Sequence, residues 1–218
     1  MPAVLIAISL PEITFQKFGM NSKFARYFTA LALLLASCAT PDREHKVVIS
    51  VPEQQMIVLK LGTPIAKYPI STSKFGLGDR PGSCETPLGR LEVARKIGDF
   101  APLGAVFKNR RATGEVLHPD APGRDPIVSR ILWLRGLDGE NHNAFGRCIY
   151  IHGTVEERNI GKAVSYGCIR MKSADVIELY NTVGTGAEVE IINAPLDTAM
   201  PQTEEKVDPE SASPKTNL

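Results

Sequence analysis

The sequence predicts one mainly β, sandwich-like domain with a single helix near its carboxyl end, and three observations lead to this prediction. Between residues 45 and 193, short runs of β-prone residues alternate with turn residues, which is the spacing of an antiparallel sandwich or barrel. Helical spacing of apolar residues is clear only after Ser173. The chain has 218 residues, enough for one well-buried domain with tails but too few for two ordinary domains.

Eight segments are expected to form strands. Between the second and third, Gly62-Thr63-Pro64 predicts a tight turn, because glycine tolerates positive φ and proline fixes its own φ. Glycines and prolines crowd residues 76–87, which are expected to form a loop. The expected strands are residues 47–51, 56–61, 65–70, 89–97, 105–108, 127–134, 148–151 and 187–192.

Two further segments complete the domain. Residues 110–125 mix prolines and glycines with charged residues, so a surface excursion is expected there, and such loops often border functional sites. The helix is expected to begin with Ser173 as its N-cap and Asp175 in its first turn. Apolar residues at helical spacing continue it towards Gly184, namely Val176, Leu179, Tyr180 and Val183.

The amino-terminal part has the layout of a secretory signal. Residues 20–38 place Lys23 and Arg26 before an apolar run at 27–35, which is followed by small residues and Cys38. That run is shorter than the ~20 residues that a membrane-spanning helix needs. Leu35-Ala36-Ser37-Cys38 resembles a bacterial lipoprotein box, in which the cysteine carries lipid; the alternative is an ordinary signal peptide. We therefore expect export to the cell envelope, in the periplasm, with lipid on Cys38 tethering the domain to the membrane.

The two ends are expected to lie outside the folded domain, which we place at residues 45–193. Residues 1–19 precede the signal and are either an upstream extension or an unusual start of the signal itself. Residues 195–218 have almost no large apolar side chain, so they cannot bury enough surface to offset their ordering entropy. A flexible tail is expected there.

Charge and cysteine content exclude several function classes. A formal net charge of +1 provides no basic field for nucleic acid. The four cysteines form no C-x-x-C pair, and the spacing of His152 and Cys168 does not favour a zinc site, so no metal or cofactor is expected. In an oxidising compartment Cys84 and Cys148 either pair, which is the only pairing that spares Cys168, or remain two partly buried thiols.

Two segments carry residues suited to nucleophilic catalysis, namely 150–154 and 165–171. Cys168 follows His152 by sixteen residues. A free thiol is mostly protonated near neutral pH, so a nucleophilic cysteine needs a neighbouring base, and His152 is the candidate. Either residue alone is more often structural, Cys168 as a small buried hydrophobe and His152 as a hydrogen-bonded strand histidine.

The neighbours of this pair supply further functions. Tyr150 and His152 alternate with Ile151 on an expected strand, so both should face the site. The backbone carbonyl of Gly153 is expected to accept from the second ring N–H of His152 and so fix its tautomer, as the third member of a catalytic triad does.

The segment around the cysteine adds backbone and charge. Gly167 allows close approach of the main chain, and N–H groups at this turn are expected to form an oxyanion hole. Arg170 is expected to stabilise the thiolate or to hold a substrate carboxylate. Ser165 and Tyr166 are expected to line the entrance.

Together the two segments resemble the signature of the L,D-transpeptidase (YkuD-type) catalytic domain. That signature is a histidine followed by glycine or serine and, after a spacer, Ser/Thr-His-Gly-Cys, an apolar residue and Arg or Asn. Residues 70–73 and 86–89 resemble its upstream strand and turn pattern. The matching positions are His152, Ser165, Gly167, Cys168, Ile169 and Arg170. Tyr166 departs from the pattern, because the family usually has histidine there, and this puts the positioning of the acceptor in doubt.

The resemblance implies a fold with Cys168 in a groove under a mobile lid, which we expect within residues 110–125. It implies a cysteine acyltransferase of peptidoglycan biosynthesis, acting in cell wall organisation and cell shape. Cys168 would form an acyl-enzyme with a tetrapeptide stem and pass it to an amine. Two alternatives remain open, namely a peptidoglycan peptidase or amidase that uses the same acyl-enzyme, and a non-catalytic wall-binding lipoprotein.

Overall fold

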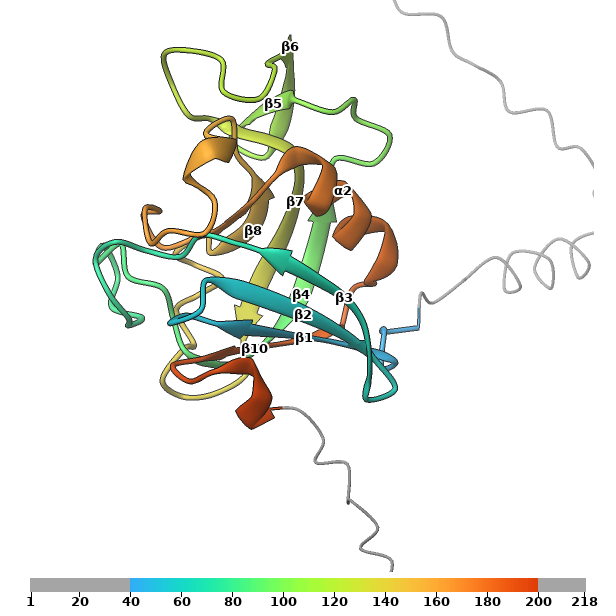
Figure 1. The fold of residues 1–218 in the computed structure, drawn as a ribbon, viewed down its shortest axis with the longest axis vertical. Coiled ribbons are helices and arrows are strands. Elements are labelled where there is room, and N and C mark those ends of the chain that lie inside the picture. Colours follow the sequence, from blue (N-terminus) through green and yellow to red (C-terminus); the bar gives the residue numbers. More distant parts are fainter. Residues whose placement is uncertain (1–39, 200–218) are drawn as a thin grey trace, which may run out of the picture. The chain divides into compact units, whose positions relative to one another are not determined.

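The computed structural model describes residues 40–199, which form a bent β-sheet with one α-helix packed against it (Figure 1). The strands follow the order β3-β2-β1-β10-β4-β7-β5-β6, and β8 pairs with β7 on one side and β9 on the other. Most pairs are antiparallel, whereas β1 with β10 and β8 with β9 are parallel. The elements are β1 (His45–Ser50), β2 (Gln55–Lys60), β3 (Thr63–Pro69), β4 (Gly89–Ile97), β5 (Ala105–Lys108), β6 (Arg111–Val116), β7 (Ile127–Gly136), β8 (Tyr150–Gly153), η1 (Glu157–Asn159), β9 (Ile169–Met171), α2 (Ser173–Thr182), β10 (Glu188–Ile192) and η2 (Leu196–Ala199).

Irregularities in β4 and β7 bend the sheet so that it encloses its own core. The pairing of β4 with β7 shifts register between Val93 and Arg95, and that of β7 with β8 shifts between Val128 and Ile131. Such shifts kink a strand and increase its twist. The largest cluster of buried side chains therefore draws on β1, β2, β4, β7–β10 and α2 together, which confirms the mainly β, sandwich-like prediction.

The strands predicted from alternating apolar residues occur close to their expected positions, and β4 and β5 have the predicted bounds. The first turn differs from its prediction. It consists of Leu61 and Gly62, both with positive φ, while Thr63 already pairs with Lys60. Two positive φ values match the right-handed twist of a two-residue hairpin, so the turn lies one residue earlier than the proline indicated.

Three other predictions about local structure need a correction. The segment 110–125 lies at the surface as expected, but it contains β6, which pairs with β5; its six residues are all exposed, so it carries no apolar alternation that would predict a strand. The strand expected at residues 148–151 is β8, which begins only at Tyr150, because Cys148 has a φ of 61° in the preceding turn. Helix α2 takes Lys172 as its N-cap, and the Ser173 N–H donates to the Glu157 carboxylate over 2.8 Å.

The folded part also extends further than expected at both ends. Asp42 accepts the Gly184 N–H over 2.7 Å. Leu196, which was assigned to the flexible tail, is 5% exposed and packs with Val48 and Leu59. The remaining predictions for residues 1–38 and 200–218, including the signal and Cys38, lie outside the described residues.

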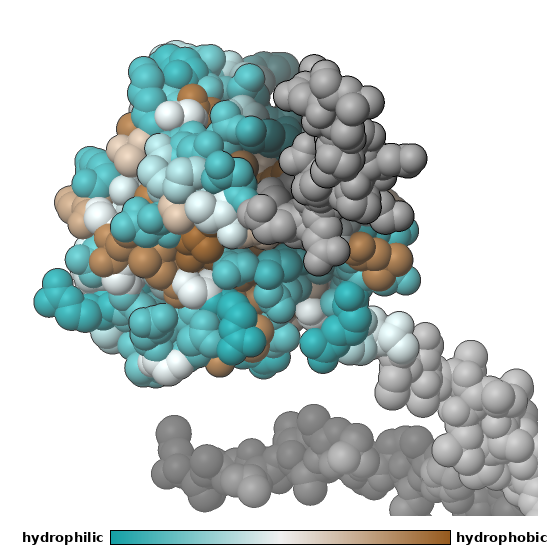
Figure 2. Space-filling model, turned by 60° about the horizontal axis from the view of Figure 1, so that its bottom comes forward, coloured by the Kyte–Doolittle hydropathy of each residue, from teal (hydrophilic) through white to brown (hydrophobic). Residues whose placement is uncertain are grey.

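The surface around this core is largely polar. The face in Figure 2 is mostly hydrophilic, with hydrophobic residues showing in a patchy band across it. Among residues 40–199, no helix is both long enough and apolar enough to cross a membrane.

Candidate active site

Strands β8 and β9 bring the two candidate catalytic residues together. They run parallel with His152 opposite Arg170, and Cys168 immediately precedes β9. If that register continues, Cys168 lies two positions along the neighbouring strand from His152, ~8 Å between Cα atoms, with both side chains on one face. Tyr150 shares this face, because it packs in a small cluster with Cys168, whereas Ile151 points into the main core. The expected alternation is therefore present.

His152 is held as a neutral base. Its side chain is 6% exposed, and its Nδ1 lies 2.8 Å from the Gly153 carbonyl oxygen, the hydrogen bond expected from the sequence. Since a carbonyl only accepts, Nδ1 carries the proton and Nε2 is left to take one up. Burial is the main cause that lowers the pKa of His152 to about 4; the hydrogen bond with Gly153 and the charge of Asp125 oppose the shift, and the charge of Arg170 adds to it. The imidazole is therefore neutral at neutral pH.

Gly153 is required by packing as well as by its carbonyl. A Cβ at this position would lie 2.6 Å from the backbone oxygen of Val128 on β7. Any larger residue would push β8 away from β7, and the carbonyl that orients His152 would move with it.

The Cys168 thiol is also neutral in the resting structure. Its Sγ donates to the Cys148 carbonyl oxygen over 3.4 Å. Burial raises the pKa of Cys168 to about 11, while a hydrogen bond with the Tyr150 backbone and the charge of Arg170 oppose the rise. A neutral thiol beside a neutral imidazole is an arrangement that suits general-base catalysis, in which the proton moves as the sulfur attacks.

Ser165 is a structural residue of the turn that precedes Cys168, and the expectation that it lines the entrance was wrong. It is fully buried, and its Oγ donates to the Cys168 carbonyl over 2.6 Å. The same Oγ accepts the Gly167 N–H over 3.3 Å. The hydroxyl therefore closes the turn that presents Cys168.

Gly167 holds a conformation that favours glycine, with φ at 114°. Its carbonyl accepts from the Thr86 hydroxyl over 3.0 Å. Because the Gly167 N–H is already bonded to Ser165, it is not available for an oxyanion. The Cys168 N–H donates to no protein acceptor within residues 40–199, which leaves it as the candidate oxyanion donor.

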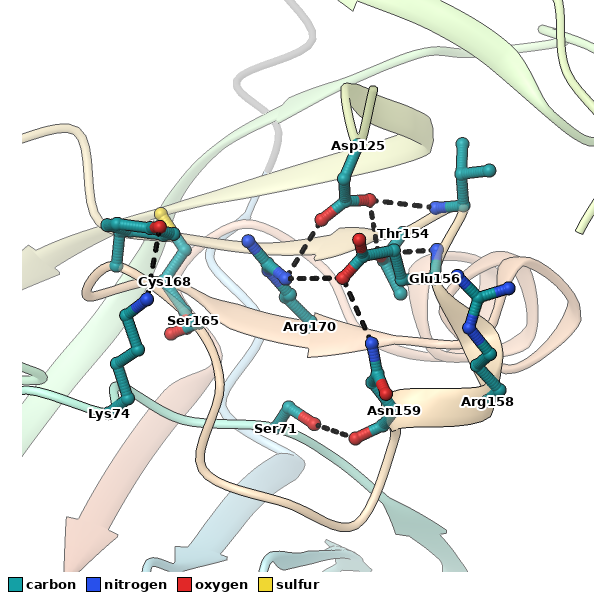
Figure 3. Close-up of polar contacts among 12 residues, drawn as sticks. Ser71, Lys74, Asp125, Thr154, Glu156, Arg158, Asn159, Ser165, Cys168 and Arg170 are labelled. Atoms are coloured by element: carbon teal, nitrogen blue, oxygen red, sulfur yellow. Dashed lines mark hydrogen bonds and ion pairs between the residues drawn. The ribbon is translucent and has the colours of Figure 1, made fainter. Parts of the chain in front are cut away.

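Arg170 is committed to two carboxylates. Its Nη1 lies 2.8 Å from Asp125 and 3.7 Å from Glu156 (Figure 3). Asp125 in turn accepts from the Thr154 hydroxyl over 2.6 Å and from the Val155 N–H over 3.1 Å. The guanidinium still favours ionisation of Cys168, as expected, but its charge is compensated, which argues against the expected alternative that it holds a substrate carboxylate.

A cavity of about 480 Å³ lies next to Arg170 on β9. Tyr166, which is 58% exposed, contributes to its wall, as expected for a residue at the entrance. Neither Lys74 nor Glu156 was singled out from the sequence, since both are ordinary surface residues until the fold places them here. The lining residues are Lys74, Asp125, Glu156, Val164, Tyr166 and Arg170.

The segment expected to hold the lid touches both sides of the site. Asp125, at its end, binds Arg170. Arg110, at its start, donates to the Tyr150 hydroxyl over 3.2 Å and stacks over the Trp133 ring at 4.8 Å.

The two other cysteines among residues 40–199 are unpaired. Cys84 and Cys148 are partly buried free thiols, which corresponds to the second of the two alternatives stated above. Cys148 lies close to the site through its carbonyl and receives a hydrogen bond from Arg110 over 3.6 Å.

Comparison with known proteins matches the chain to one family. Residues 44–191 match the model of the L,D-transpeptidase catalytic domain, YkuD. The probable L,D-transpeptidase YcfS of Escherichia coli K12 is 27% identical over 182 residues, covering 82% of this chain and 53% of its own. The probable L,D-transpeptidase YbiS of the same organism is 30% identical over 161 residues, covering 72% and 47%.

The chain thus spans about half the length of these relatives. Among solved structures, an L,D-transpeptidase from Mycobacterium tuberculosis H37Rv matches with a TM-score of 0.45 and 17% identity, over 68% of this chain and 57% of that one.

Proposed function

Because the chain belongs to the L,D-transpeptidase (YkuD) catalytic domain family, we propose that it is a peptidoglycan L,D-transpeptidase with Cys168 as nucleophile and His152 as base. The donor is a tetrapeptide stem, attacked at the carbonyl that links meso-diaminopimelate to the terminal D-alanine. The acceptor is an amine on a second stem, on a lipoprotein or on a free D-amino acid.

The first half-reaction forms a thioester. Neutral His152 takes the thiol proton through Nε2 as the sulfur attacks the carbonyl carbon, and the oxyanion accepts from the Cys168 N–H. The carbon–nitrogen bond then breaks, His152 returns the proton to the leaving amine, and D-alanine departs. In the second half-reaction His152 deprotonates the acceptor amine, which attacks the thioester and releases the Cys168 thiol.

The hydrogen bond between His152 Nδ1 and the Gly153 carbonyl carries this proposal. It leaves Nε2 as the acceptor, on the strand next to Cys168, without an acidic third residue. The low pKa of His152 also suits acyl transfer, since it keeps the imidazole in its neutral form, which can act as a base.

The test is incubation of the purified chain with a disaccharide tetrapeptide, followed by measurement of D-alanine, cross-linked dimer and free stem. Wild type and Cys84→Ala should release D-alanine and form dimers, while Cys168→Ala should do neither. A Cys168→Ala protein that retains turnover would refute the assignment of the nucleophile, and a wild type without turnover would favour the wall-binding lipoprotein.

Hydrolysis of the same acyl-enzyme is the second candidate. Two features favour it: an open cavity is lined by Tyr166 and Arg170, the residues two positions before and after Cys168, and a tyrosine replaces the usual histidine at position 166. Release of D-alanine with only free tripeptide stem, and no dimer, would identify a peptidase.

We also propose export to the periplasmic side of the envelope and lipid attachment at Cys38. The signal-like segment 20–38 and the lipobox-like end support this. Mass spectrometry of the membrane fraction should find a diacylglyceryl modification on Cys38, and Cys38→Ala should abolish it. An unmodified Cys38 in a mature membrane-bound chain would exclude a lipoprotein.

A further inference from the structure

We propose that Lys74 and Tyr166 together form a carboxylate-binding subsite that selects the donor stem peptide. This inference rests on the proposed function. It assigns a binding role to a lysine that is far in sequence from the two catalytic segments. Its ligand is a free carboxylate on the stem, close to the carbonyl that Cys168 attacks.

The geometry of Lys74 suits a small anion. Its Nζ lies 3.1 Å from the Tyr166 hydroxyl oxygen and 4.5 Å from the centre of the Tyr166 ring. It also lies 5.2 Å from the centre of the Phe75 ring, and the two aromatic rings are 5.4 Å apart. The rings restrain the ammonium by cation–π contact, while its remaining N–H donors and the phenol O–H are available to an acceptor.

Charge distribution in the cavity favours Lys74 over Arg170 as the anion partner. Arg170 is bound to Asp125 and Glu156, on the side of the site away from Cys168 in Figure 3. Lys74 lines the same cavity, and it takes part in none of the ion pairs found among residues 40–199. Among the charged residues that line the cavity, Lys74 is therefore the cation left uncompensated. A carboxylate entering there gains an opposite charge without displacing an existing ion pair.

The subsite is rigidly connected to the nucleophile. The Lys74 N–H donates to the Ser165 carbonyl over 3.2 Å, and Ser73 forms a β-bridge with Ser165. Ser165 in turn bonds the Cys168 carbonyl over 2.6 Å. The backbones of Lys74 and Cys168 therefore belong to one short hydrogen-bonded unit, which fixes where the lysine side chain starts relative to the nucleophile.

Two carboxylates of the donor fit this chemistry. One belongs to the terminal D-alanine and lies one residue, about 3.8 Å between Cα atoms, from the attacked position. The other belongs to the side-chain end of diaminopimelate. Each has a testable consequence. Binding of the D-alanine carboxylate would restrict the donor to tetrapeptides. Binding of the diaminopimelate side-chain carboxylate would require diaminopimelate with a free carboxylate as the third residue of the stem.

The experiment measures peptide binding to the full chain carrying Cys168→Ala, by calorimetry, so that affinity is separated from turnover. Three ligands are compared: the tetrapeptide with both carboxylates free, its D-alanine carboxamide, and the form amidated on diaminopimelate. Each is titrated into the parent, into Lys74→Met and Tyr166→Phe, and into Lys67→Met, an exposed lysine on β3 that serves as the matched control.

For the free tetrapeptide we expect Lys74→Met to raise Kd roughly 5- to 20-fold and Tyr166→Phe roughly 2- to 5-fold, because a partly exposed charge-assisted contact is lost. Lys67→Met should change nothing. Amidation of the carboxylate that occupies the subsite should weaken binding to the parent by the same factor and have no further effect in Lys74→Met. The amide that does so identifies which carboxylate is bound.

The proposal is overturned if Lys74→Met binds the free tetrapeptide as tightly as the parent. It is also overturned if both amides lose the same affinity in the Lys74→Met and parent proteins, which would make Lys74 only a support for Tyr166. Failure of the proposed function is distinguishable, because it shows as absent turnover in the chain with Cys168 intact, whatever the binding pattern.

Discussion

On one flank of Cys168, His152 is 6% exposed and oriented by a backbone carbonyl, whereas on the other flank Lys74 and Tyr166 meet through their side chains at the surface. The buried flank depends on strand pairing and on a glycine that admits no larger residue. The exposed flank depends on charge. Under the proposed function, the acid–base residue is therefore oriented by the backbone, which tolerates little change, whereas the proposed substrate contacts come from side chains that can be replaced. The following predictions test this contrast, from the largest expected effect to the smallest.

Replacing the base should give the largest effect. We expect His152→Asn to lower kcat for D-alanine release by about 10²–10⁴-fold, because no other group takes the thiol proton. The measurement is steady-state release from the tetrapeptide, with thermal unfolding to show that the variant folds. Activity within tenfold of wild type would show that another group is the base, and that the buried position of His152 does not serve catalysis.

The pH dependence of stability should report the same residue. His152 has a pKa of about 4 in the fold, below the unfolded value of 6.5, so the unfolded chain binds more protons between these values. The free energy of unfolding should therefore fall by on the order of 3 kcal/mol as pH drops from 6.5 to 4. Cys168 has a raised pKa, so its contribution should instead be lost as pH rises from 9 towards 11.

Urea denaturation across pH measures both the acid and the alkaline loss of stability. His152→Asn should remove most of the loss between pH 6.5 and 4. Cys168→Ala should remove the loss between pH 9 and 10, since tyrosines such as Tyr68, whose pKa burial raises to about 12, contribute only above pH 10. An acid loss that is unchanged in His152→Asn would mean that carboxylates, and not the imidazole, control it.

Gly153→Ala should damage stability and catalysis together. Its Cβ would lie 2.6 Å from the Val128 oxygen, so β8 must shift, at a cost of about 2–3 kcal/mol. The shift should also lower kcat by roughly 10-fold or more, since the carbonyl that orients His152 moves. Gly139→Ala is the matched control, because nothing lies within 4 Å of a Cβ there. A stable Gly153→Ala protein with normal kcat would contradict the proposed role of this carbonyl.

The contrast also explains how much of the molecule could be predicted from its sequence. Strands with one buried face, such as β4 and β10, show alternation that a single sequence reveals. Strand β6 is wholly exposed and β9 has three residues, so neither carries enough periodicity. Their existence depends on partners that are distant in the sequence.

The site divides in the same way. His152 and Cys168 were identifiable because their neighbours in the chain, including Gly153 and Gly167, carry a recognisable pattern. Lys74 and Glu156 were not, because they are far apart in sequence and their local sequence carries no signal of chemistry. Ser165 was recognised, but its burial was not, since a hydroxyl that closes a turn looks the same in sequence as one that faces a ligand.

Asp125→Asn tests whether charge compensation at Arg170 directs the anion to the exposed flank, and it should give the smallest of these effects. The carboxylate bonds Arg170, Thr154 and Val155, so its loss should destabilise the fold by about 1–2 kcal/mol, less than for a fully buried pair because solvent reaches this cluster. Lys46, paired with Glu188 and Glu190 on the open sheet, is the control, and Lys46→Met should cost less than about 0.5 kcal/mol. Asp125→Asn also frees part of the Arg170 charge, so Arg170 should begin to compete with Lys74 for the substrate carboxylate. If Kd for the tetrapeptide then becomes less sensitive to Lys74→Met, charge compensation at Arg170 is what directs the anion to Lys74; if the sensitivity is unchanged, distance alone directs it.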